Sequence, residues 1–160
     1  MKKIIMIALA ALTLCGSIFA KTFVIDLGDS KNGSTISIVK NPYAPNYQCE
    51  LPADFTAFFA GNMPQPGDKI EVHYNFTSNV DIEWLNIVVI DNSEAAKYWL
   101  EISDYKGISN IKAGAPNVGV IEYKVVKKPI KNLTVMFSYD KALNAKLTLA
   151  KAGAKTGSVK

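Results

Sequence analysis

The residues of this sequence best suited to a chemical role are its aromatic side chains, and the role that they suit is ligand binding. A sugar ring has apolar C–H faces that stack on flat aromatic rings, while nearby polar side chains bind its hydroxyls. Trp99 alternates with Tyr98 and Leu100, so it points outward if those two lie in the core; the opposite phase is an open alternative. Trp84 begins an apolar run and is expected in the core. The candidate binding residues are Trp99, Tyr105, Tyr43, Tyr47 and Glu101.

Oxygen-bearing side chains form a second candidate site. Asp26, Asp29 and Asn32 recur every third residue, and calcium prefers carboxylate and amide oxygens. The spacing does not match an EF-hand, and Asp and Asn are also common turn formers. We therefore expect either a structural calcium ion at these residues or a simple turn.

Catalytic groupings are sparse. His73 is the single histidine and falls on the polar side of its strand, where a surface role is expected. There is no Gly-x-Ser-x-Gly motif, and the nearest carboxylate pairs are Asp81 with Glu83 and Glu101 with Asp104. We expect no enzymatic activity, with a glycoside hydrolase as the remaining alternative.

The start of the chain has the pattern of an export signal. Lys2 and Lys3 precede an apolar run over residues 4–14, and Ala20 supplies a small residue before a cleavage point at Lys21. We therefore predict export to the periplasm or the medium, most simply from a bacterium. The run is too short to span a bilayer, and no later segment is long and apolar enough.

Lipid anchoring through Cys15 is the alternative interpretation of this signal. Leu14 precedes that cysteine, where lipoprotein signals have a small residue. If the signal is removed before Lys21, Cys49 is the remaining cysteine, and the alternation around it predicts a buried strand residue. A cross-link to another chain is the alternative for Cys49.

The charge pattern argues against nucleic-acid binding. The formal net charge is +4, the lysines are dispersed, and there is no arginine to form bidentate contacts with phosphate or guanine. We therefore expect a carbohydrate, an envelope polymer or a protein as the partner.

Period-2 alternation runs through most of the sequence and predicts an all-β fold. Ile70, Val72 and Phe76 share one face of the clearest strand. All seven prolines fall in predicted loops. The predicted domain, residues 21–152, is an antiparallel two-sheet β-sandwich, followed by a small, polar and flexible tail over 153–160. The segments with a strand pattern or a short apolar run are 22–27, 34–40, 47–51, 55–59, 68–78, 83–90, 97–103, 108–112, 117–126, 132–139 and 145–150.

The turn and strand over 66–72, the segment 81–91 and the closing pair 133–139 and 145–150 resemble jelly-roll carbohydrate-binding modules, also called galactose-binding-like domains. The resemblance lies in the pattern of strands and includes no ligand motif. It implies a jelly-roll sandwich and sugar binding. We expect a non-catalytic binding domain for a carbohydrate or cell-envelope polymer, with a structural or protein-interaction module, such as an adhesin or a subunit, as the alternative.

Overall fold

The structure, a computed structural model, describes residues 20–31, 34–40, 47–49, 53–91, 93, 106–126, 129–139 and 144–160, with the backbone alone at residues 31 and 47–49. Ten strands and two short helices lie in this part of the chain. The strands are β1 (Thr22–Asp26), β2 (Thr35–Lys40), β3 (Tyr47–Cys49), β4 (Ala53–Asp54), β5 (Lys69–Ser78), β6 (Ile82–Asp91), β7 (Lys106–Ile111), β8 (Asn117–Lys124), β9 (Leu133–Tyr139) and β10 (Ala145–Leu149). The helices are α2 (Leu27–Lys31) and the 3-10 turn η1 (Thr56–Phe59).

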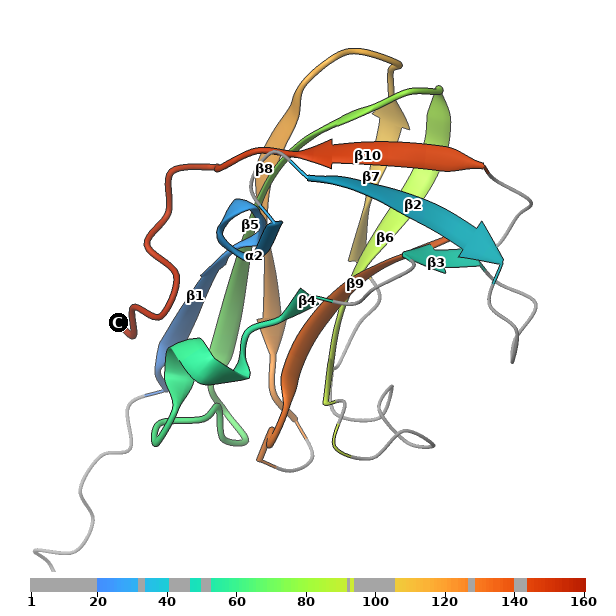
Figure 1. Cartoon of the computed structure of the whole chain (residues 1–160). Coiled ribbons are helices and arrows are strands. Elements are labelled where there is room, and N and C mark those ends of the chain that lie inside the picture. Colours follow the sequence, from blue (N-terminus) through green and yellow to red (C-terminus); the bar gives the residue numbers. More distant parts are fainter. Residues whose placement is uncertain are drawn as a thin grey trace, which may run out of the picture.

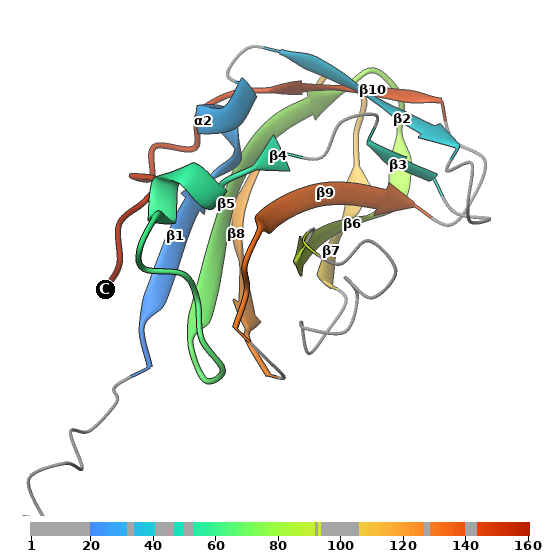
Figure 2. The same ribbon diagram turned by 60° about the horizontal axis from the view of Figure 1, so that its bottom comes forward.

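The strands form two packed sheets. Hydrogen bonds join neighbouring strands in the order β1-β5-β10-β2-β3-β9-β6-β7. In addition, β8 pairs with β5, and β4 pairs with β9. The path folds back so that β1, β5 and β8 face β6, β7 and β9, while β10, β2 and β3 cross at one end (Figure 1 and Figure 2). The described strand pairs are antiparallel except β1 and β5, which run parallel. The predicted all-β, two-sheet fold is confirmed, and the jelly-roll topology stays a prediction.

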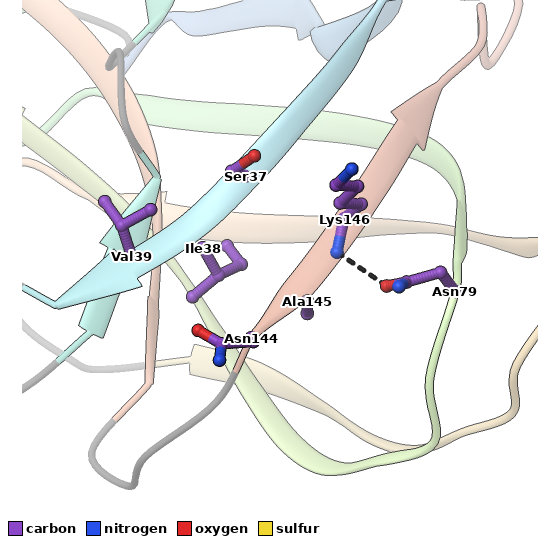
Figure 3. Close-up of a pocket in the computed structure, with 7 residues that line it drawn as sticks. All are labelled: Ser37, Ile38, Val39, Asn79, Asn144, Ala145 and Lys146. Atoms are coloured by element: carbon purple, nitrogen blue, oxygen red, sulfur yellow. Dashed lines mark hydrogen bonds between the residues drawn. The ribbon is translucent and has the colours of Figure 1, made fainter.

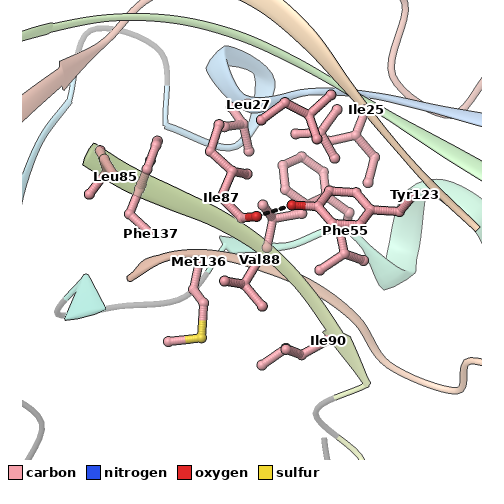
Figure 4. Close-up of a cluster of buried hydrophobic side chains, with 14 of the residues drawn as sticks. Ile25, Leu27, Phe55, Leu85, Ile87, Val88, Ile90, Tyr123, Met136 and Phe137 are labelled. Carbon is pink, nitrogen blue, oxygen red and sulfur yellow. Dashed lines mark hydrogen bonds between the residues drawn. The ribbon is translucent and has the colours of Figure 1, made fainter. Parts of the chain in front are cut away.

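The hydrophobic core fills the space between these sheets. Phe76 of β5 meets Phe137 of β9 edge to face, with ring centroids 5.4 Å apart. The hydroxyl of Tyr123 in β8 donates to the carbonyl of Ile87 in β6, across the core (Figure 4). Apolar packing and one buried hydrogen bond therefore both connect the two sheets.

Apolar and polar residues alternate along β5, whereas most of β6 is apolar, and this difference explains which residues of each strand are buried. In β5, Ile70 and Val72 are fully buried, while Glu71 lies half-buried on the outer face. β6 lies between β7 and β9, and both Val88 and Val89 are buried although they point to opposite faces. The apolar run therefore forms a central strand in which both faces are covered at Val88 and Val89.

The segment that follows β10 lies along the outer edge of β1. Thr22 exchanges two backbone hydrogen bonds of 3.0 Å with Lys160, and Val24 bonds with Gly157 and Ser158 in the same way. The sequence predicted a flexible tail over 153–160, whereas the structure pairs it antiparallel to β1. Small polar side chains give no sequence signal for this pairing, because backbone groups make the bonds.

The apolar run over 55–59 includes a helical turn. Phe55 and Phe59 are buried and Phe58 is 46% exposed, a spacing that suits one helical turn better than a strand. Asp54 fixes the start of this turn, since its Oδ1 accepts the Thr56 N–H at 2.8 Å.

Candidate functional site

Trp84 is the exposed tryptophan of the described residues, and it is held in a fixed position. Its side chain lies on the outer face of β6 and is 44% exposed. Nε1 donates to Oδ1 of Asn86 at 2.8 Å. A Cβ added to Gly107 of β7 would lie 2.6 Å from the indole carbons Cε2 and Cζ2, so the ring covers the backbone of that glycine. We call Trp84, Asn86, Gly107 and Ser109 the Trp84 surface.

The strand register explains how this surface forms. Trp84 lies opposite Ser109 and Asn86 lies opposite Gly107 in the antiparallel β6–β7 pair. Gly107 leaves room for the indole to lie across the neighbouring strand. The exposed indole is thus hydrogen-bonded to a carboxamide and belongs to the residue opposite a serine, an arrangement suited to a sugar ring.

The prediction that Trp84 belongs to the core is wrong. Its apolar neighbours misled the assignment, because Leu85 and Ile87 are buried while Trp84 is out of phase with them. The signal that could have found it is the alternation of Leu85, Asn86 and Ile87, which places Trp84 on the face opposite to the two buried apolar residues.

A shallow cavity of about 250 Å³ lies between β2, β10 and the turn that follows β5 (Figure 3). Its polar side chains are Ser37, Asn79, Asn144 and Lys146. Oδ1 of Asn79 accepts the backbone N–H of Lys146 at 2.6 Å, so this amide fastens the turn to β10. The volume is below the range of about 300–1,000 Å³ that is usual for ligand pockets. The Trp84 surface is therefore the better candidate.

The calcium candidates Asp26 and Asp29 already have protein partners. The carboxylate of Asp26 is buried and accepts backbone N–H groups from Gly28 and from residues 152–154, at 2.8–3.1 Å. Asp29 pairs with Lys151 at 2.9 Å. Hydrogen bonds from Thr156 and Lys151 lower the pKa of Asp29. The N–H groups around Asp26 already stabilise its negative charge, and a calcium ion bound there would displace them. The calcium site stays a prediction.

His73 belongs to a polar network on the outer face of β5. Nε2 of His73 lies 3.4 Å from Oε2 of Glu71, and Nζ of Lys160 lies 3.1 Å from the same oxygen. The hydrogen bond from Lys160, followed by that from His73, lowers the pKa of Glu71 despite its partial burial. This network ties the segment after β10 to the sheet.

Asp81, one half of a candidate carboxylate pair, is engaged in an ion pair. Its Oδ2 lies 2.8 Å from Nζ of Lys112, and its Oδ1 accepts the N–H of Ala113. These contacts, with that of Lys112 the largest, lower the pKa of Asp81. A general acid needs the opposite shift.

The other predicted site residues lie outside the described side chains. These are Trp99, Tyr105, Tyr43 and Glu101 of the binding surface, the side chain of Tyr47, and Asn32 of the calcium site. Tyr47 and Cys49 lie in β3, as the alternation predicted, and only their backbone is described. The predicted binding surface of these five residues therefore stays a prediction.

The fold and the Trp84 surface define a class of protein, an all-β two-sheet domain with an exposed aromatic face. Comparison with protein-family models gave no match, and comparison with curated proteins gave no significant one. Among the residues that the structure describes, none of the helices is long and apolar enough to cross a membrane. The same residues contain no cluster of three or more His, Cys, Asp or Glu that could hold a metal ion.

Proposed function

We propose that this protein is an exported, non-catalytic binding protein whose ligand is a carbohydrate or a cell-envelope polymer. The observation that carries the proposal is the exposed indole of Trp84, which is held flat over Gly107. A rigid aromatic ring loses little conformational entropy when a ligand stacks on it. Ser109 and Asn86 lie beside it to hydrogen-bond hydroxyls.

The predicted resemblance to carbohydrate-binding modules supports the same function. Tyr105, directly before β7 in the sequence, and the other predicted aromatic residues would extend the surface if they lie on the same side. The proposal does not depend on them, because Trp84 and its neighbours form a surface by themselves.

The test is glycan-array and polysaccharide-retention binding of the full chain, with and without EDTA. A lost stacking contact of about 1.5 kcal/mol weakens binding about tenfold, and we expect that loss for Trp84→Ala. Phe58→Ala is the matched control, because Phe58 is an aromatic residue of similar exposure on η1. Equal binding by Trp84→Ala and wild type would refute this site. A signal lost with EDTA would support the calcium site.

A protein-interaction module is the second candidate function, and β8 favours it. Val118 and Val120 are 61% and 51% exposed on a strand that pairs, in the described residues, with β5 alone. Exposed apolar residues on an edge strand favour pairing with a strand of another protein. Nζ of Lys106 donates a hydrogen bond of 2.6 Å to one backbone carbonyl of β8, that of Glu122. Size-exclusion chromatography of Val120→Lys against wild type tests whether this edge mediates association.

A further inference from the structure

Asp68 is a buried carboxylate that accepts hydrogen bonds from backbone N–H groups alone among the described residues. It is 4% exposed, and Oδ2 accepts the N–H of Gln65 at 2.8 Å. Oδ1 accepts the backbone N–H of Lys21 at 2.9 Å. None of the ion pairs among the described side chains includes Asp68. Asp68 accepts two backbone N–H groups, whereas the similarly buried Asp26 accepts four and Asp91 accepts three. The Asp68 carboxylate is therefore the least satisfied of the three and has room for a cationic donor.

The backbone nitrogen of Lys21, which donates to Asp68, is the atom that a signal peptidase would convert from an amide into a free amine. The sequence predicts cleavage between Ala20 and Lys21, and both residues are exposed. We propose that the mature chain begins at Lys21 and that its new α-ammonium is the cationic partner of Asp68. The inference depends on the proposed export and not on the proposed ligand.

Hydrolysis of this peptide bond is balanced by one water molecule. The C–N bond breaks, Ala20 keeps a carboxylate, and Lys21 gains an amine that is protonated near neutral pH. The backbone nitrogen of Lys21, a neutral amide that donates one hydrogen to Asp68, becomes a charged donor with three hydrogens. Charge-assisted hydrogen bonds of this type are about twice as strong as neutral ones.

Two further contacts hold Lys21 in place independently of cleavage. Its carbonyl accepts the N–H of Lys69 at 2.8 Å, and its Nζ donates to Oδ1 of Asn62 at 3.1 Å. The loop before β5 thus supplies Asn62 and Asp68 as partners of Lys21, while Gln65 of the same loop donates to Asp68. Cleavage would therefore add a charge at a nitrogen that is already positioned.

The test uses the full chain, exported from a bacterial host and purified without affinity tags. Intact mass and N-terminal sequencing are expected to give a chain that starts at Lys21. The α-amine is then labelled with an amine-selective reagent and followed by peptide mapping. Because the ion pair protects the amine, we expect labelling about tenfold slower in wild type than in Asp68→Asn.

Asp81→Asn is the matched control, since Asp81 also accepts an ammonium and a backbone N–H but lies far more exposed. It is expected to label at the wild-type rate. If Asp68→Asn does not fold, folded wild type is compared with urea-unfolded wild type, and the same difference is expected.

Three results would overturn the inference: a different first residue, including an acylated Cys15; equal labelling of the α-amine in wild type and in folded Asp68→Asn; or equal labelling in the folded and unfolded wild-type chains. Neither readout depends on glycan binding. A chain that starts at Lys21 but binds no glycan would count against the proposed ligand alone.

Discussion

The carboxylate of Asp26 and the backbone amide of Gly153 are 127 positions apart in the sequence and are joined by a hydrogen bond of 2.8 Å. Ala152 and Ala154 donate to the same carboxylate, at 2.9–3.1 Å. A single side chain at the end of β1 thus fixes the point where the chain leaves β10 and turns back along β1. The antiparallel pairing of residues 157–160 with β1 begins just beyond this contact.

Asp26→Asn is expected to destabilise the protein by about 3 kcal/mol, because the replacement leaves buried N–H groups without a charged acceptor. Urea unfolding measures this change. Hydrogen exchange should show faster exchange at the amides of residues 152–157 than elsewhere. Asp29→Asn is the control, and its partly exposed ion pair with Lys151 predicts a loss of no more than about 1 kcal/mol. A similar loss for both variants would contradict the anchoring role of Asp26.

Tyr123→Phe is expected to lower the free energy of unfolding by about 1–3 kcal/mol. It removes the hydroxyl that donates to the Ile87 carbonyl between the two sheets. Burial also raises the pKa of Tyr123, so the hydroxyl keeps its proton. Tyr74→Phe is the matched control, because Tyr74 is only half-buried, and a change within about 0.5 kcal/mol is expected. Thermal or urea unfolding of both variants checks the prediction.

Gly107→Ala is expected to displace the Trp84 indole. The new methyl group would lie 2.6 Å from two ring carbons, which is too close for a real contact. The methyl group would also lie 2.7 Å from the backbone carbonyl oxygen of Leu85, so the β6–β7 pair must shift locally as well. We expect weaker glycan retention together with a shifted tryptophan fluorescence spectrum. Retention equal to wild type would mean that the position of the ring does not matter for binding. Ser109→Ala removes a neighbouring hydroxyl and leaves Gly107 unchanged, so it is expected to keep the wild-type fluorescence spectrum and serves as the control for the position of the ring.

Acid is expected to destabilise the fold through Asp91 and Glu71. Burial raises the pKa of Asp91, but backbone N–H groups of Ser93, Lys131 and Asn132 outweigh it and hold the pKa below its ordinary value of 3.8. The pKa of Glu71 is likewise lowered from 4.5. A carboxylate with a lowered folded pKa stabilises the protein above its unfolded pKa, and this stability is lost as pH falls through the folded value.

The free energy of unfolding should therefore fall as pH drops below about 4.5. Asp91→Asn and Glu71→Gln should each be less stable than wild type near neutral pH and should lose less on acidification. Urea unfolding at a series of pH values measures both slopes. Variants whose acid slope equals that of wild type would show that other carboxylates dominate.

The strands were predictable from sequence because alternation is a local property. The regular pattern of residues 68–78 and 132–139 led directly to β5 and β9. The apolar run over 83–90 likewise led to β6, since a strand buried on both faces has few positions for polar residues.

The tertiary structure alone decided the contacts that join distant residues. The sequence placed Trp84 in the core and Asp26 in a calcium site or a turn, because neither Gly107 nor residues 152–154 are near them in the chain. The candidate site and the anchored tail both depend on strand register and on backbone N–H groups, which all residues except proline possess. Amino-acid types therefore determined the strands and the sheet faces, whereas the folded chain determined which groups meet.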